Sequence, residues 1–276
     1  MNFKFLAVIS LLFFKSSLFA TDSRLDAISL SEFESISKEL QANFTHTAVS
    51  SAGVEGNIFG FDLGIIAGAT KSKELEKLAK ELDPDAGFGL IPHAALMATV
   101  SVPLGFSGEA TFTPKVELSG LTYKSNSFAL KWTFSKVLGG FFDNSIRLHY
   151  SKNDLSYEQV IQNAGTGNNP INSNISFSNT VTGLSYLIGK SLKVIEPWVG
   201  IGYVKGKTDV DIKASGNATI FDQTVAESSR QGLSKTNRGI HLFAGLNVNL
   251  LVLRAGLEVS NLFGVNKVTA KTTIFF

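Results

Sequence analysis

The chain has 276 residues, 44% of them hydrophobic, with 22 Phe, 25 Gly and a formal net charge of +2. This near balance of charge excludes the basic excess on which nucleic-acid binding depends. The absence of Cys excludes a disulfide framework, a thiolate metal site and a lipid-modified amino terminus.

Residues 1–20 predict a secretory signal peptide. Lys4 lies in a short basic region, Phe5 to Phe14 form an apolar run, and Ala20 suits the position before a cleavage site. A membrane anchor would need roughly 20 apolar residues. We therefore predict export with cleavage near residue 20, which leaves 23 basic and 23 acidic residues.

Residues 24–44 predict an amphipathic helix within an N-terminal helical segment, residues 21–50. Apolar side chains recur at spacings of three and four, at Leu25, Ile28, Phe33, Ile36, Leu40 and Phe44. The helix precedes every predicted strand, so it forms either a periplasmic helix or tail, or a plug in or under a barrel. Its position resembles the plug-like N-terminal segment of some transporters of hydrophobic compounds.

Residues 71–82 predict a second helix, which ends before Asp83 and Pro84. Its charges lie nearly all round the helix. Such a pattern is typical of a surface exposed to water, so we predict a solvated loop helix.

Residues 87–107 are the most apolar part of the remaining chain, but Pro92 and Pro103 argue against a transmembrane helix there. Only helices and closed barrels satisfy their backbone hydrogen bonds inside a bilayer. An apolar exported chain without helical spans is therefore either a closed barrel or a soluble β-rich domain.

Alternation with period two dominates the rest of the sequence. Phe128, Leu130 and Trp132 share one face of a predicted strand, and Lys131 and Thr133 share the other. Membrane barrels place the apolar face outward and the polar or small face inward. A soluble β-sandwich has the same alternation with the apolar face inward, so the pattern alone leaves both folds open.

The segments predict an all-β fold, a closed antiparallel up-and-down transmembrane β-barrel over residues 51–276. The pattern fits about ten strands, and eight to twelve remain compatible with it. We place the strands near residues 55–69, 93–103, 109–123, 126–137, 144–155, 174–187, 195–211, 236–249, 251–262 and 267–276.

The connections between these strands alternate in length. If the C terminus is periplasmic, the long connections 70–92, 156–173 and 212–235 all fall outside the cell, together with 124–125 and 263–266. The periplasmic connections are short, at 104–108, 138–143, 188–194 and near 250. Outer-membrane barrels have this asymmetry.

The chain ends in an alternating strand that stops on an aromatic residue. One face carries Val268, Ala270, Thr272, Ile274 and Phe276. This ending resembles the C-terminal signal that the barrel-assembly machinery recognises in outer-membrane proteins of Gram-negative bacteria. The resemblance implies that Ile274 and Phe276 are the assembly signal. It also implies that the protein resides in the outer membrane, in contact with lipid and lipopolysaccharide.

Strand parity directs a small set of ionisable side chains into the lumen. These lumen-lining candidates are Asp62, Lys131, Arg147, His149, Arg254, Glu258 and Lys271. Closure of the sheet would bring Asp62, Lys271, Arg254 and Glu258 near one another. Such a group is either a salt-bridged network that seals a narrow lumen or part of a conducting path.

His149 and Ser151 lie two residues apart on one strand face, a spacing that resembles the His and Ser of some outer-membrane lipid-A deacylases. Nucleophilic catalysis also needs an acid to orient the His and an oxyanion site, and neither is evident. His46, His93 and His241 lack metal-ligand spacing. We predict no enzyme activity, no metal and no cofactor.

Three functions fit these features. The first is a narrow channel or transporter for small or hydrophobic solutes, with a small hydrophobic molecule as a candidate ligand. The second is a structural or surface-interaction barrel with a sealed lumen. The third, a soluble secreted β-sandwich, would not be embedded in a membrane.

Overall fold

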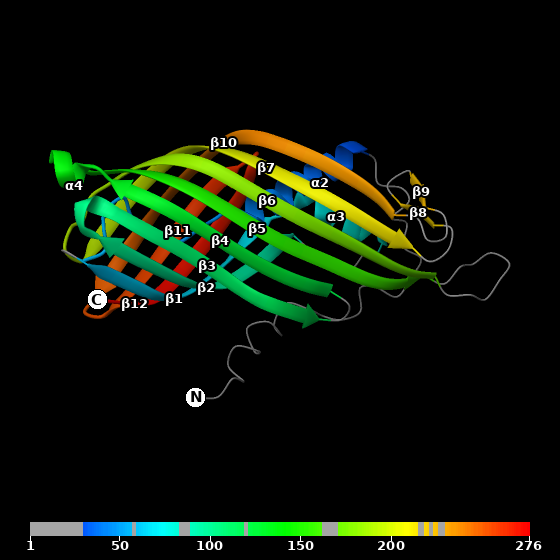
Figure 1. Ribbon diagram of the computed structural model, residues 1–276, viewed down its shortest axis with the longest axis horizontal. Coiled ribbons are helices and arrows are strands. Elements are labelled where there is room, and N and C mark those ends of the chain that lie inside the picture. The colour runs from blue at the N-terminus through cyan, green and yellow to red at the C-terminus, as the bar shows by residue number, and fades with distance from the viewer. Residues whose placement is uncertain are drawn as a thin grey trace, which may run out of the picture.

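The computed structural model describes residues 30–56, 59–82, 89–118, 121–161, 171–214, 218–220, 223–225 and 230–276. The predicted signal peptide lies outside these residues. Ten strands form one closed antiparallel barrel, in which β1 pairs with β12 (Figure 1). The predicted up-and-down barrel is confirmed, and a two-sheet sandwich is excluded.

The barrel strands are longer than predicted at several ends. They are β1 (Gly60–Lys71), β2 (Leu90–Val102), β3 (Phe106–Leu118), β4 (Leu121–Thr133), β5 (Asp143–Ile161), β6 (Ile171–Gly189), β7 (Ile195–Ala214), β10 (Arg230–Leu250), β11 (Leu253–Leu262) and β12 (Val265–Phe275). The remaining elements are α2 (Leu30–Phe44), α3 (Lys73–Leu82), η2 (Pro103–Gly105), α4 (Ser135–Leu138), and the hairpin strands β8 (Ala218–Ile220) and β9 (Gln223–Val225).

Several predicted boundaries are wrong. The first strand begins at Gly60 and not at residue 55, and β3 and β4 are joined at residues 119–120 and not at 124–125. The connection predicted at 212–235 is partly strand, because β7 and β10 extend into it and pair as far as Lys213 and Arg230. The sequence did not predict these extensions as strand, because their many polar residues leave them without a continuous apolar face.

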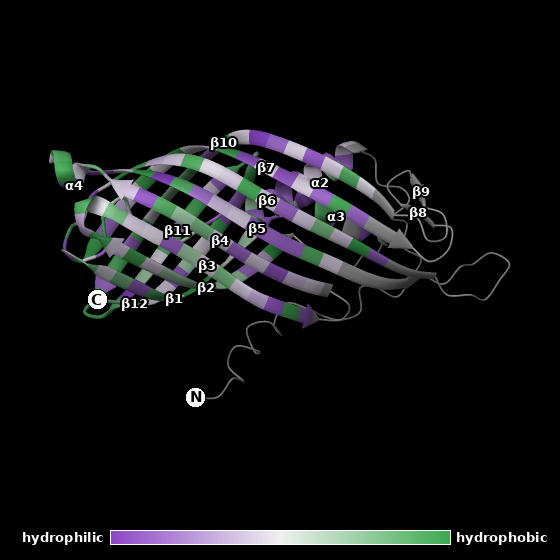
Figure 2. Cartoon of the chain, in the orientation of Figure 1, coloured by the Kyte–Doolittle hydropathy of each residue, from purple (hydrophilic) through white to green (hydrophobic). Residues whose placement is uncertain are grey.

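The two ends of the barrel differ. The turns at 103–105, 134–142, 190–194 and 251–252 lie at one end, which we call the short-turn end. The α3 connection and the β8–β9 hairpin lie at the other, the long-loop end (Figure 1). In Figure 2, hydrophobic residues gather toward the short-turn end and hydrophilic ones toward the long-loop end.

The outer face of the barrel is apolar and the inner face is polar. Phe128 and Leu130 are 59% and 55% exposed, whereas Lys131 and Thr133 on the opposite face are fully buried. This is the inverse of a soluble domain and matches a surface that faces lipid. No helix in the described ranges is long and apolar enough to cross a membrane.

The lumen is occupied by residues 30–56, which we call the plug. Helix α2 lies inside the barrel near the long-loop end, and residues 45–56 continue to the short-turn end, where β1 begins (Figure 1). Of the two placements left open by the sequence, the structure has the plug within the barrel. The plug continues past residue 50, the predicted end of the N-terminal segment.

Helix α2 packs its apolar stripe against the barrel wall. Phe33, Ile36, Leu40 and Phe44 form one buried cluster with Ile175 of β6 and Val210 of β7. These four residues recur at the predicted helical spacing. Two further buried apolar clusters join the wall to the plug, one around Val49 and one around Ala42.

The joint between β2 and β3 has the shortest ladder in the described barrel. It consists of seven residue pairs, from Val102↔Phe106 to Leu96↔Phe112. Beyond it, β2 continues to pair with β1, and β3 continues to pair with β4. Residues 90–95 and 113–118 therefore face each other without a backbone ladder, and we call this opening the β2–β3 seam.

Candidate functional site: the interface between plug and barrel

All seven lumen-lining candidates from the sequence lie inside the barrel, and each is at most 3% exposed. They do not form one cluster. Arg254, Asp62 and Lys271 lie together toward the short-turn end, and Lys131 and Arg147 lie around a different carboxylate. Oε2 of Glu258 has no hydrogen-bond partner among the described residues, and no ion pair seen there joins Glu258 to Arg254 or Lys271.

The first charged group joins the end of the plug to the β1–β12–β11 wall. Asp62 Oδ2 lies 3.1 Å from Nη1 of Arg254 and 3.2 Å from Nζ of Lys271. Arg254 also forms an ion pair with Glu55 of the plug. Sequence parity missed Glu55, because the residue lies in the segment that was predicted to begin the first strand.

The second charged group lies around Glu109 of β3. The Nε2–H group of His46 of the plug donates to Oε2 at 3.0 Å, and the Ser50 hydroxyl donates to Oε1 at 2.5 Å. Nζ of Lys131 and Nη1 of Arg147 lie 3.7 and 3.8 Å from the same carboxylate. Glu109 was missed because it opened a predicted strand, although it shares its inward parity with Thr111.

Arg147 is the least satisfied member of the second group. Its guanidinium lies 5.0 Å above the Phe243 ring, and none of its three nitrogens has a hydrogen-bond partner in the described residues. A buried cation without hydrogen bonds is costly. The Glu109 carboxylate is therefore needed to balance the cations around it.

Two buried lysines bind the backbone of the plug from different strands. Lys131 of β4 donates to the carbonyl oxygens of Ser51 and Gly53 at 2.7 and 2.8 Å. Lys267 of β12 donates to those of Asn43 and Thr45, both at 3.0 Å. Lys267 thereby caps the carboxyl end of α2, where carbonyls lack helical partners. Its inward parity with Lys271 was a usable signal for this site.

The long-loop end of the plug holds α3. The Glu39 carboxylate accepts hydrogen bonds from the backbone N–H groups of Lys73 and Glu74, at 2.7 and 2.9 Å. Leu75 of α3 packs on the apolar cluster of α2. The predicted loop helix is present with exposed lysines, but it is not solvated on every side, because a buried carboxylate of the plug binds its amino end.

Glu34 forms a further contact at this end. Its carboxylate lies 2.5 Å from Lys235 of β10 and 2.8 Å from Lys38. Hydrogen bonds from Lys235 and then from Lys38 lower the pKa of Glu34 from 4.5 to about 2. The carboxylate is half-exposed, so water weakens the pair.

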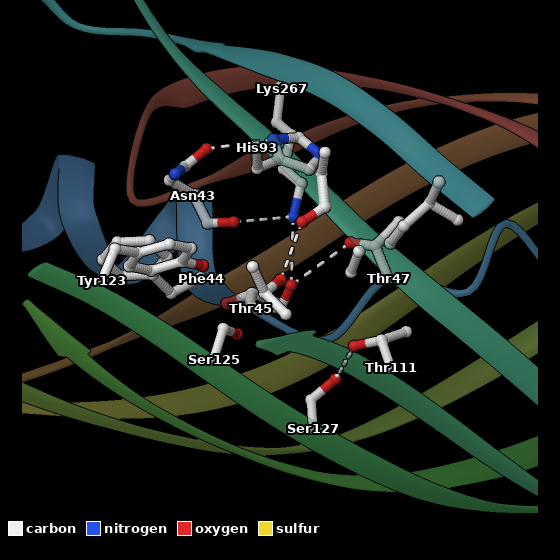
Figure 3. Close-up of a pocket in the computed structure, with 14 residues that line it drawn as sticks. Asn43, Phe44, Thr45, Thr47, His93, Thr111, Tyr123, Ser125, Ser127 and Lys267 are labelled. Carbon is white, nitrogen blue, oxygen red and sulfur yellow. Dashed lines mark hydrogen bonds between the residues drawn. The ribbon is translucent and has the colours of Figure 1, made fainter. Parts of the chain in front are cut away.

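A small cavity lies between the plug and strands β1 to β4 and β12 (Figure 3). Its volume is about 30 Å³. Tyr123 of β4 stacks on Phe44 of the plug, with ring centroids 5.3 Å apart. His93 contacts Asn43 Oδ1 at 3.1 Å and Thr269 Oγ1 at 3.0 Å. The other lining residues are Thr45, Thr47, Ile66, Ala94, Ala95, Thr111, Thr113, Ser125, Ser127 and Lys267.

His149 and Ser151 both point into the lumen, and neither forms a hydrogen bond with the other or with any described residue. The nearest ring to His149 is His46, at a centroid distance of 6.0 Å. Within the described part of the chain, no group of three or more His, Asp or Glu residues is arranged to hold a metal.

Beyond α2 the interface is partly polar and partly apolar. Hydrogen bonds and ion pairs join the plug to the wall, and their groups can exchange protein partners for water when they separate. Ala48, Val49 and Ala52 also pack in an apolar cluster with wall residues. The apolar exterior, the closed strands and the polar, occupied lumen define an outer-membrane β-barrel with an internal plug.

A family model, described as a family of unknown function (DUF6588), matches residues 17–262. The chain belongs to this family. No curated protein sequence matches the chain significantly.

Solved structures with a similar fold include three outer-membrane proteins. The translocator domain of autotransporter NalP from Neisseria meningitidis is 11% identical, covers 95% of this chain and 99% of its own, and has a TM-score of 0.42. Ail, the attachment invasion locus protein of Yersinia pestis, is 13% identical, with 81% and 100% covered and a TM-score of 0.30. Neisserial surface protein A is 10% identical, with 79% and 95% covered and a TM-score of 0.28.

Proposed function

We propose that the protein is a transport barrel of the outer membrane in which residues 30–56 close the lumen until they move. The observation that carries this proposal is the series of hydrogen bonds and ion pairs that joins the plug to the barrel wall between Gln41 and Glu55. The short-turn end faces the periplasm, and small solutes are the substrates.

Displacement of the plug would expose a charged passage. The side chains of Lys131, Arg147, Glu109, Asp62 and Arg254 would then line water along much of the barrel. Charges of both signs in a narrow lumen select small polar or amphiphilic solutes by size and field. In a ten-stranded barrel this passage is narrow, because barrels of about eight strands are filled by their side chains.

A barrel with a permanently sealed lumen is the second candidate. The burial of Phe33, Ile36 and Leu40 against the wall favours it, because withdrawal of α2 would expose apolar surface. Long polar loops would then carry a surface role. The two candidates differ in whether the plug moves in a folded barrel.

A reversible disulfide tests this difference. A Cβ added at Gly53 would lie 3.0 Å from the hydroxyl oxygen of Ser191, and the natural chain has no Cys. The pair Gly53→Cys and Ser191→Cys would therefore tie the plug to the β6–β7 turn. Ser191→Cys alone is the matched control.

Conductance is measured in planar bilayers with the full-length protein. We expect intermittent openings in the wild type, none in the oxidised double variant, and their return on reduction. A variant lacking residues 30–54 should conduct continuously if it assembles. Equal conductance in oxidised and reduced double variant, or a silent wild type, would contradict the proposal in favour of the sealed barrel.

A further inference from the structure

The β2–β3 seam is an interruption in the barrel wall. Ladder pairing stops at Leu96 and Phe112. Beyond them, the hydrogen bond seen between the described parts of the two strands is that of the Thr113 hydroxyl, which donates to the Ala94 carbonyl at 2.7 Å. Unpaired backbone is costly in lipid and is tolerated where it borders protein or a polar cavity. The seam therefore requires something polar behind it.

Two prolines keep the seam open. Pro92 lies in the unpaired part of β2, and Pro114 lies in the unpaired part of β3, within a β-bulge between Thr113 and Val116. Proline has no N–H to donate, and a bulge shifts the ladder. The two strands consequently cannot form a backbone ladder here, and the two prolines in the sequence are the cause.

The seam lies at the edge of the lipid-facing band that is nearer the long-loop end, which we call its upper edge. Its lower end, Leu96, pairs with Ile65, whose side chain is 43% exposed among the outward apolar residues. Its upper end, Leu90, pairs with Lys71, and the exposed ion pair of Lys115 and Glu117 lies on the other edge. A molecule crossing the seam would have one part in lipid and another among polar groups.

The cavity lies directly behind the seam. Ala94 and Ala95 from one edge and Thr113 from the other line it, together with the plug and with Thr111 of the adjoining ladder. Figure 3 shows Thr111 and the plug residues around the cavity. Its lining contains one ammonium group, that of Lys267, and no carboxylate. Thr and Ser residues contribute most of the other polar side chains of the lining. The chemistry therefore suits an anion.

The volume of the cavity limits how large the bound anionic group can be. A volume of about 30 Å³ holds roughly two water-sized groups, enough for a carboxylate and too little for a sugar or a hydrocarbon chain. Any longer part of the molecule must leave through the seam. There it would meet the outward faces of Pro92, Ala94 and Phe112, which are exposed to lipid.

We propose that the β2–β3 seam binds a long-chain amphiphile with one acidic head group, held by Lys267, while its tail lies along the outer wall in lipid. This rests on the proposed transport function and names its substrate class and side entrance. The bound head group competes with the carbonyl oxygens of Asn43 and Thr45 for Lys267. Binding thus weakens the cap that holds the carboxyl end of α2.

The test compares two probes with the same tail, dodecanoate and dodecanol, by equilibrium binding to the full-length protein in nanodiscs of uncharged phospholipid. The buffer is alkaline enough to ionise the carboxylate. We expect the wild type to bind dodecanoate roughly tenfold or more tightly than dodecanol, the usual effect of a charge-assisted hydrogen bond. Lys267→Gln should remove this preference, and Lys267→Arg should keep it.

Lys131→Gln is the matched control, because it also removes a buried ammonium that binds two plug carbonyls but does not line the cavity. It should keep the preference for dodecanoate. Ala95→Trp, which fills the cavity, should abolish the binding of dodecanoate without removing Lys267. Assembly of each variant is checked by its heat-modifiable migration on gels.

Equal binding of the two probes by the wild type would overturn the inference, as would an unchanged preference in Lys267→Gln or an equal loss in Lys131→Gln. The last result would mean that a loosened plug, and not the head-group site, caused the effect. Conductance separates this failure from that of the transport proposal. Selective dodecanoate binding by a barrel that never conducts would leave the site standing and reject transport through the lumen.

Discussion

Nε2 of His46 lies 3.0 Å from the carboxylate of Glu109, and Nδ1 of the same ring lies 2.7 Å from the Ser127 hydroxyl. All three side chains are buried. One ring of the plug is thus bound to two neighbouring strands, β3 and β4, in the middle of the lumen.

Glu109→Ala removes the carboxylate that balances His46, Lys131 and Arg147. Breaking a buried ion pair by removing one partner costs about 3–5 kcal/mol, because the remaining charges lose their compensation. We expect a loss of this size in the free energy of unfolding, measured by urea titration in lipid vesicles. Glu117→Ala, at a side chain 67% exposed, is the control and should change it by about 0–1 kcal/mol. Similar losses in both variants would contradict a special role for Glu109.

Glu39→Ala removes the carboxylate at the amino end of α3. Loss of such a cap costs about 0.5–2 kcal/mol, so the helix should leave the plug more often. Trypsin cleavage after Lys73 and Lys77 in the folded protein should accelerate. Ser35→Ala, which lies on α2 as Glu39 does, is the control. Unchanged cleavage rates in Glu39→Ala would show that packing of Leu75 suffices to hold α3.

Glu34 provides a pH dependence with a defined sign. Its pKa in the folded protein is about 2, below the ordinary value of 4.5, because Lys235 and Lys38 bind the charged form. The stabilisation is therefore complete above pH 4.5 and is lost as the pH falls toward 2. The difference in Tm between wild type and Glu34→Gln should be constant near neutrality and shrink in acid. A difference that grows in acid would reverse the assignment.

Gly206 is a point of close approach between wall and plug. An added Cβ would overlap Oε1 of Gln41, a side chain that donates to Thr208 and accepts from Asn237. Gly206→Ala should cost roughly 1–3 kcal/mol of unfolding free energy by overpacking. Gln41→Ala should suppress this cost in a double-mutant cycle. Gly108→Ala, where no atom lies within 4 Å of the added Cβ, is the control. Additive effects would mean that the two residues do not touch.

The sequence predicts the barrel strands of this protein better than it predicts the plug inside them. Alternation places Lys131 inward and Leu130 outward, because the side-chain period of a strand equals two whatever the strand pairs with. Helical spacing predicts α2 for the same local reason. In both cases the apolar pattern lies within a single strand or helix.

Residues 45–56 could not be predicted in this way. They have no period, and their extended conformation depends on Lys131, Glu109 and Arg254, which lie far away in the sequence. The β2–β3 seam was also missed, although Pro92 and Pro114 are visible in the sequence. A proline identifies a free edge only once it is known which two strands would otherwise pair.

The joint between β1 and β12 sets an order on folding. The plug precedes β1 in the chain, and the ring closes by pairing its first strand with its last. A closed ring cannot admit a segment from the side, so the plug either lies between the strands before they meet or is threaded lengthwise afterwards. Contacts from β3, β4 and β12 already surround it. If the plug is in place before β1 and β12 meet, removal of residues 30–56 should slow the appearance of heat-modifiable barrel on gels, whereas lengthwise threading predicts an unchanged rate.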